Sequence, residues 1–207
     1  MNLSGFQDIF TNIIFFFLSI FIFIFSIGPD KEIISIIGVG IVWTLLLLSS
    51  TLSLRKFYQD DFDSGNLLIM HLSGFSYGFI AILKTFSHFL FVQVPFLLSI
   101  PIACVLLNIA NDKLIYLFTS FAIGSFILSC LGSISASMNL MNQRNFLLGS
   151  LIVMVFSVPI IIFSVGLINI EENFNSLISI LYGILLIVFA VNPWASGLCL
   201  KISLENN

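Results

Sequence analysis

The chain has 207 residues, of which 59% are hydrophobic and only 8% are charged, whereas a typical soluble domain is about 25% charged. A water-soluble fold of this size could not bury so much apolar surface, so we predict a polytopic integral membrane protein with a single domain over residues 1–207. The net charge of -3, with no basic run longer than Arg55-Lys56, argues against a nucleic-acid-binding protein.

Six apolar stretches separated by polar residues predict an all-α bundle of six transmembrane helices. They lie at residues 13–27, 33–54, 79–109, 114–138, 146–168 and 177–200. The segment from Met1 to Asn12 has no Lys or Arg and no A-x-A cleavage site follows, so we interpret the first stretch as a membrane helix and not as a signal peptide. The third stretch is too long for one span, and Lys84 and His88 indicate that its membrane part begins near Ser87, while Phe79 to Leu83 lies at the interface.

The basic residues predict the orientation of the bundle. Five of them fall on one side of the six-helix arrangement and two on the other, which by the positive-inside rule predicts that both termini are cytoplasmic. The five are Arg55, Lys56, Lys84, Arg144 and Lys201, and the two are Lys31 and Lys113. The loops on the opposite side are short and mostly acidic, with Asp30, Glu32, Asp112, Glu171 and Glu172.

The longest hydrophilic stretch, at about residues 55–84, falls on the predicted cytoplasmic side. It contains Asp60, Asp61 and Asp63, then Gly65 and an apolar run at residues 67–70. This order fits a short amphipathic helix that lies along the membrane and can contact a cytoplasmic partner. A merely solvated loop fits equally well, because charged runs are common at membrane surfaces.

The sequence contains few residues of the kind that carry chemistry. No lysine follows a glycine, so the phosphate-binding loop pattern is missing and we do not expect ATP hydrolysis by this chain alone. His71 and His88 lack partners at ligand spacing, so interfacial histidines are favoured over metal or haem ligands. All seventeen Asp, Glu, Lys and Arg residues are placed in loops or at helix ends, which disfavours an ion-coupled pump. The cysteines Cys104, Cys130 and Cys199 are interpreted as small hydrophobic residues.

Two further patterns concern the helices themselves. Small polar residues repeat every four positions in the fourth helix, at Ser125, Ser129, Ser133 and Ser137. This face favours close helix packing, with the lining of a transport path as the alternative. Pro95, Pro101 and Pro159 lie inside apolar stretches, where each removes a backbone hydrogen bond and permits a kink.

Several segments in order resemble one known family. They are Ser26-Ile27-Gly28-Pro29, Gly40-Ile41-Val42-Trp43, Phe57-Tyr58-Gln59-Asp60-Asp61-Phe62-Asp63-Ser64-Gly65, Lys84 with His88, Pro95 and Pro101 around a Leu-Leu-Ser run, Pro159-Ile160-Ile161-Ile162-Phe163, and Asn192-Pro193-Trp194-Ala195. Together they resemble the cytochrome c maturation protein B family, also called haem exporter protein B, over residues 26–203. The chain departs from the family pattern at Leu68 and Ser64, where acidic residues are common, and in its short N-terminal segment without Lys or Arg.

The resemblance implies an ABC-2-type permease with both termini inside, in the bacterial inner membrane or, for an organelle-encoded protein, the mitochondrial inner membrane. Its implied partners are a separate ATPase subunit (cytochrome c maturation A), the C and D membrane subunits and the haem chaperone E. Haem is then either the transported cargo, or ATP hydrolysis drives the release of the haem-loaded chaperone. The residues matched to the contact with the ATPase are Phe57, Asp60, Asp61 and Gly65.

Two alternatives stay open at this stage. One is an ABC-2 permease for another cargo, such as a polysaccharide or a drug. The other is a membrane scaffold that transports nothing. If deletion of the gene removes c-type cytochromes and leaves other exports intact, a haem system is favoured over a permease for another cargo. Stimulation of an ATPase by the purified protein would argue against the scaffold.

Overall fold

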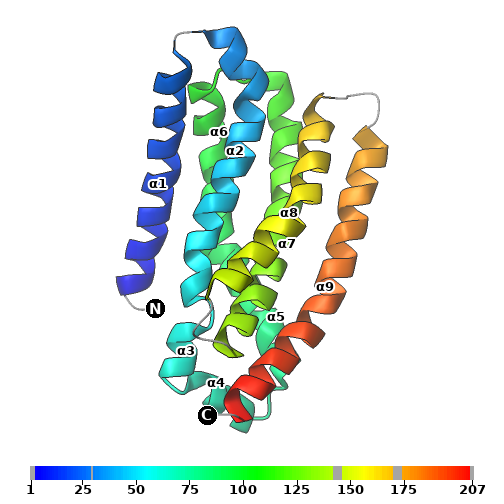
Figure 1. Cartoon of the computed structure of the whole chain (residues 1–207). Helices are drawn as coiled ribbons and strands as arrows, with labels where there is room; N and C mark the ends of the chain where they lie inside the picture. Colours follow the sequence, from blue (N-terminus) through cyan, green and yellow to red (C-terminus); the bar gives the residue numbers. More distant parts are fainter. Residues whose placement is uncertain (1–2, 29, 142–145, 170–173, 206–207) are drawn as a thin grey trace.

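The computed structural model describes residues 3–28, 30–141, 146–169 and 174–205, and this part of the chain is helical apart from short turns (Figure 1). Arg144, Glu171 and Glu172, used above to predict the orientation, lie outside these residues. The elements in order are α1 (Leu3–Ile27), α2 (Lys31–Ser53), η1 (Leu54–Lys56), α3 (Gln59–Asp63), α4 (Asn66–Leu72), α5 (Tyr77–His88), η2 (Phe89–Gln93), α6 (Val94–Leu106), η3 (Asn111–Lys113), α7 (Leu114–Met141), α8 (Phe146–Asn169) and α9 (Phe174–Glu205).

Six helical stretches of the described chain are long and apolar enough to cross a membrane, which confirms the predicted number. They are Ile9–Ile27, Lys31–Ser53, Tyr77–Leu106, Asn111–Met141, Gly149–Leu167 and Phe174–Glu205. The start of α1 and the end of α9 lie at the same end of the bundle, as an even number of spans requires (Figure 1). The short helices α3 and α4 cover this same end.

The third span lies in a helix that begins at Tyr77 and runs for 30 residues to Leu106, about 45 Å at 1.5 Å per residue. The point near Ser87 at which its membrane part is expected to begin stays a prediction. Lys84 is therefore inside a helix and not at its end. Ser76 starts this helix because its side chain accepts a hydrogen bond from the backbone N–H of Phe79 at 3.3 Å.

A π-helical turn interrupts the third span immediately before a proline. Pro95 has no N–H to offer to Phe91, the residue four positions earlier. Over Phe89–Gln93 the pattern shifts by one residue, so that Val94 N–H donates to the carbonyl of Phe89. Such π turns are a known way to accommodate a break in the α-helical ladder. Helices α6 and α8 continue through Pro101 and Pro159.

The centre of the bundle is α7, whose small residues admit large partners. Trp43 of α2 is fully buried, with its ring 4.5 Å from that of Phe121. The indole rests on Gly124, where an added Cβ would lie only 2.2 Å from Trp43 Cη2. The position therefore needs glycine because the tryptophan occupies the space of a side chain.

Helices α5 and α9 cross backbone to backbone near the end that carries α3 and α4. An added Cβ at Gly197 would lie 2.9 Å from the backbone nitrogen of Gly78, and one at Gly78 would lie 3.0 Å from the carbonyl oxygen of Pro193. Small residues at a crossing are typical of membrane helices that pack closely. This crossing brings polar side chains of α5 and α9 within hydrogen-bonding distance of each other.

Candidate functional site

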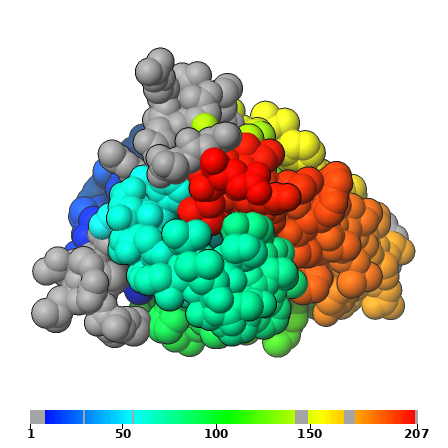
Figure 2. Space-filling view, turned by 90° about the horizontal axis from the view of Figure 1, so that it is seen from below, coloured from blue at the N-terminus to red at the C-terminus, as the bar shows by residue number. Residues whose placement is uncertain are grey.

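The residues between the second and third spans, 54–76, form a compact cap that we call the connecting segment. Figure 2 looks onto it: its atoms and the first part of α5, in cyan to green, lie beside the C-terminal part of α9 in red. Gly65 joins α3 to α4 in the left-handed conformation, with φ of 73°. A side chain at this position would be strained, which is a local physical reason for glycine between the two helices.

Two aromatic residues attach the connecting segment to the bundle. Phe57 is buried, with its ring 4.7 Å from the ring of His88 on α5. Tyr58 is only 1% exposed and reaches into the bundle toward α7. Phe57 thus fixes the segment to the third span, and its part in coupling to an ATPase stays a prediction.

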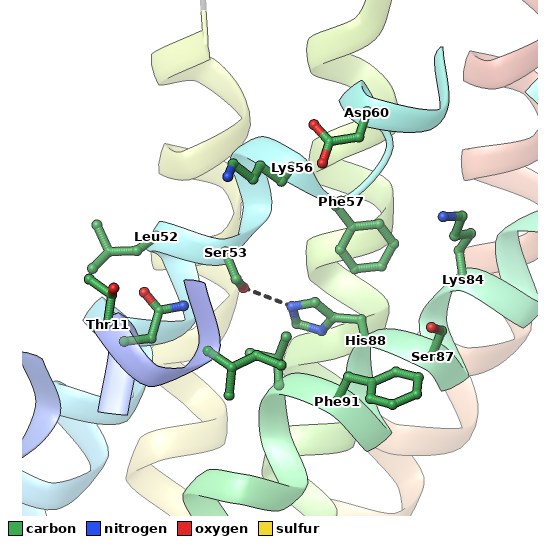
Figure 3. A pocket seen from close by; sticks show the side chains of 13 residues that line it. Thr11, Leu52, Ser53, Lys56, Phe57, Asp60, Lys84, Ser87, His88 and Phe91 are labelled. Atoms are coloured by element: carbon green, nitrogen blue, oxygen red, sulfur yellow. Dashed lines mark hydrogen bonds between the residues drawn. The ribbon is translucent and has the colours of Figure 1, made fainter. Parts of the chain in front are cut away.

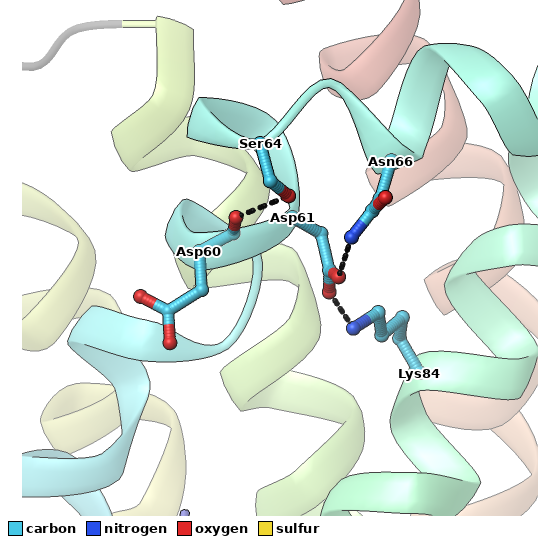
Figure 4. A network of polar contacts seen from close by, with 5 residues as sticks. All are labelled: Asp60, Asp61, Ser64, Asn66 and Lys84. Carbon is cyan, nitrogen blue, oxygen red and sulfur yellow. Dashed lines mark hydrogen bonds and ion pairs between the residues drawn. The ribbon is translucent and has the colours of Figure 1, made fainter. Parts of the chain in front are cut away.

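The two neighbouring aspartates of α3 have different surroundings (Figure 4). Asp61 forms an ion pair with Lys84 of α5 and accepts a hydrogen bond from Asn66 at 3.4 Å. Asp60 is exposed, and its backbone carbonyl accepts a 2.7 Å hydrogen bond from Ser64. Asp61 thus ties the connecting segment to the third span, while Asp60 is exposed and lines a cavity beside the segment.

Helix α4 has one buried and several exposed apolar residues. Leu67 packs into the core, whereas Leu68, Ile69 and Leu72 are exposed, Leu72 to 77%. Of the two alternatives that the sequence left open, the structure has a helix here. The exposed leucine and isoleucine side chains form an apolar surface at the same end of the molecule as Asp60.

A chain of hydrogen bonds continues from the connecting segment into the bundle. Tyr58 Oη lies 2.7 Å from Ser133 Oγ on α7, which lies 3.1 Å from Ser196 Oγ on α9. Ser196 donates to Asn192 Oδ1 at 2.9 Å, and Asn192 Nδ2 donates to Thr85 Oγ1 on α5 at 2.9 Å. The chain thus joins the connecting segment to three of the six spans.

The donors in this chain can be assigned because each hydroxyl has one proton. Ser196 uses its proton on Asn192, so Ser133 must donate to Ser196. Tyr58 must therefore donate to Ser133. Burial raises the pKa of Tyr58, which keeps its hydroxyl protonated and able to serve as this donor.

The two histidines are both engaged within the protein. His88 is buried within the protein: its Nε2 lies 2.8 Å from Ser53 Oγ and its Nδ1 lies 3.1 Å from Ser129 Oγ. His71 stacks on Tyr77 with 4.0 Å between ring centroids. With both ring nitrogens occupied, His88 has none left to coordinate a metal or haem iron. Among the residues that the structure describes, no group of three or more His, Cys, Asp or Glu side chains could hold a metal ion.

The serine row of α7 is buried, but its members have different partners. Ser129 and Ser133 bond to other helices, through His88 and through Tyr58 and Ser196. Ser125, Ser129 and Ser137 donate to carbonyls of their own helix. The packing or path-lining role of this face stays a prediction.

Sequence reasoning did not identify several of the residues that hold this site together. Thr85, Gln93 and Asn192 are fully buried polar residues inside apolar spans, and Gln93 Nε2 donates to Ser50 at 3.1 Å. Polar residues inside a span are rare and conspicuous, so their position alone could have marked them. Their partners come from distant parts of the chain and are not visible in the sequence.

Comparisons with known proteins agree with this architecture. The family model described as CcmB protein matches residues 3–203. The chain is 30% identical to "Heme exporter protein B" of Haemophilus influenzae over 93% of this chain and 88% of that protein. The proteins of the same name from Rhodobacter capsulatus and Escherichia coli K12 are 27% and 25% identical, each over 92% of this chain and over 89% and 88% of their own lengths. The chain therefore belongs to the CcmB family.

Proposed function

We propose that this chain is the membrane permease subunit of an ABC-type haem export system that serves the biogenesis of c-type cytochromes. Its relatives carry the name "Heme exporter protein B", and they align over nearly the whole chain. The sequence has no phosphate-binding loop, so the energy is to come from a separate ATPase subunit, cytochrome c maturation A. The C and D membrane subunits and the haem chaperone E complete the proposed assembly in the inner membrane.

The ATPase is proposed to bind the outer face of the connecting segment. The observation that carries this proposal is the exposed apolar surface of Leu68, Ile69 and Leu72 beside the exposed Asp60, on an element tied to the bundle from inside. Apolar side chains surrounded by polar ones are the usual composition of a protein contact. Motion of a docked ATPase would reach the spans through the segment's internal attachments.

The four residues matched to coupling then divide into two roles. Asp60 contacts the ATPase directly. Phe57, Asp61 and Gly65 act from inside: Phe57 and Asp61 hold the segment on α5, and Gly65 sets the turn that presents α4. The prolines Pro95, Pro101 and Pro159 mark the places where the spans are proposed to bend during transport.

Co-purification of the ATPase subunit tests the docking surface. Replacing Leu72 by serine, or Asp60 by lysine, should reduce recovery of the ATPase because the exposed contact surface changes while the buried attachments stay. Glu205→Lys is the matched control for charge, since Glu205 is exposed at the same end of the bundle and lies on α9. Full recovery of the ATPase with both variants would refute this docking surface.

Cargo is tested separately in cells. Deletion of the gene should abolish c-type cytochromes while leaving other exports intact. Loss of a polysaccharide or drug export with normal cytochromes would instead favour a permease for another cargo. Failure of the purified chain to stimulate the ATPase in membranes would favour a scaffold that transports nothing.

A further inference from the structure

A cavity of about 430 Å³ opens between α1 and α5 beside the connecting segment (Figure 3). Its polar lining includes Asn12 of α1, Lys56 of η1, Asp60 of α3, and Lys84 and Ser87 of α5. Its apolar lining includes Leu52 and Phe91, whose side chains are exposed at its edge. Further along α1, the ring of Phe16 packs 5.5 Å from that of Phe96 on α6, which closes the gap on that side.

The cavity lies at the level where the spans leave the hydrocarbon core. Asn12 is the fourth residue of the first span and Ser53 is the last residue of the second. Lys56 and Asp60 follow beyond that end. The glycerol and phosphate groups of a phospholipid occupy this boundary layer, while acyl chains lie beside the exposed Leu52 and Phe91.

Asn12 points to a ligand because its carboxamide has no partner in the described structure. The residue is only 8% exposed, it lines the cavity, and no hydrogen bond reaches its side chain from any described residue. A carboxamide can form several hydrogen bonds, and buried polar groups almost always form at least one. A molecule in the cavity with ester or phosphate oxygens would supply the missing partner.

The charges around the cavity select the headgroup. Among the described residues that line it are two cations, Lys56 and Lys84, and one anion, Asp60. Both lysines also have a further interaction, which for Lys84 is the ion pair with Asp61. A purely anionic ligand would meet the carboxylate of Asp60, and a cation would meet the lysines. A headgroup that contains both a phosphate and an ammonium group matches both signs.

From this arrangement we infer that the cavity binds one phosphatidylethanolamine molecule of the adjoining leaflet. Its phosphate lies toward Lys56 and Lys84, its ammonium donates to Asp60, and its ester oxygens accept from Asn12. Haem fits less well, because its two carboxylates would face Asp60. The one histidine on the cavity, His88, has both nitrogens engaged by Ser53 and Ser129.

Native mass spectrometry of the purified full-length chain tests this inference. The detergent-solubilised protein is titrated with phosphatidylethanolamine, phosphatidylcholine or phosphatidylglycerol. We expect one phosphatidylethanolamine to bind about tenfold more tightly than the other two lipids, and Asn12→Leu to remove about tenfold of that affinity. Asn175→Leu, the same change at an exposed position where α9 begins, should leave binding unchanged.

A second variant tests the charge argument without disturbing the interior. Asp60 is exposed, so Asp60→Asn leaves the fold intact and should shift the preference from phosphatidylethanolamine to phosphatidylglycerol. Equal binding of the three lipids to the unaltered chain would overturn the inference, as would an unchanged preference in both Asn12→Leu and Asp60→Asn. Stoichiometric haemin that displaces the lipid, and is itself lost in Asn12→Leu, would assign the cavity to another ligand. The binding measurements use the chain without the ATPase, so their outcomes do not depend on the docking contact proposed for Asp60.

Discussion

The hydrogen bond from Tyr58 to Ser133 attaches the connecting segment to the centre of the bundle, and a double-mutant cycle can measure it. The cycle compares Tyr58→Phe, Ser133→Ala and the double variant in their free energies of unfolding. Because Tyr58 is the donor, the two single changes have different consequences. This asymmetry gives the prediction a sign as well as a size.

Tyr58→Phe removes a donor but leaves no buried proton without an acceptor, since Ser133 still donates to Ser196. We expect a loss of about 1 kcal/mol, the net value of one hydrogen bond. Ser133→Ala leaves the buried Tyr58 hydroxyl without its acceptor, which costs about 1–3 kcal/mol. In the Ser133→Ala background, Tyr58→Phe should therefore be neutral or stabilising, because it removes the unpaired hydroxyl.

Equilibrium unfolding of the purified chain in mixed micelles measures all four free energies. Ser120→Ala provides the control background. Ser120 is buried on the same helix and bonds only to its own helix, at Leu117; it lies about 20 Å along α7 from Ser133. Tyr58→Phe should lower the unfolding free energy by the same amount in the Ser120→Ala background as in the unaltered chain. An equal cost of Tyr58→Phe with and without Ser133 would refute the assigned bond.

Three further predictions use the same unfolding measurement. Gly124→Ala should lower the unfolding free energy by about 1–3 kcal/mol, because the new methyl group meets a buried indole; Gly183→Ala, which meets open space, should not. The unfolding free energy of the unaltered chain should exceed that of Tyr58→Phe by less and less above pH ~10, with a slope of about 1.4 kcal/mol per pH unit. The reason is that the folded state raises the pKa of Tyr58, so the tyrosine of the unfolded chain ionises first. A pH-independent difference would contradict the burial of its hydroxyl. Lys84→Met should lower the unfolding free energy by no more than about 1 kcal/mol, because the ion pair of Lys84 with Asp61 is partly exposed. Adding Asp61→Asn to this variant should restore part of that loss. No restoration would argue against the ion pair.

The sequence predicts the six spans well because lipid selects for long apolar runs, and these can be read locally. It places Lys84 in a loop or at a helix end, whereas Lys84 lies inside α5, because a lysine inside a span is expensive unless it is paired. The partner of Lys84 is Asp61, 23 positions earlier in the chain. Only the return of the connecting segment onto α5 brings the two together, and no local pattern encodes that return.

The serines of α7 explain why the site was harder to predict than the fold. Ser125, Ser129, Ser133 and Ser137 have the same spacing, and each has a carbonyl of its own helix within reach as an acceptor. Ser125, Ser129 and Ser137 use that acceptor. Ser133 instead donates to Ser196 of α9. The backbone crossing of α5 and α9 then brings Asn192 of the same helix within reach of Thr85. The last link of the chain that begins at Tyr58, from Asn192 to Thr85, thus depends on how closely two glycines allow α5 and α9 to approach. A larger residue at Gly78 or Gly197 should break this link without changing any of its polar groups.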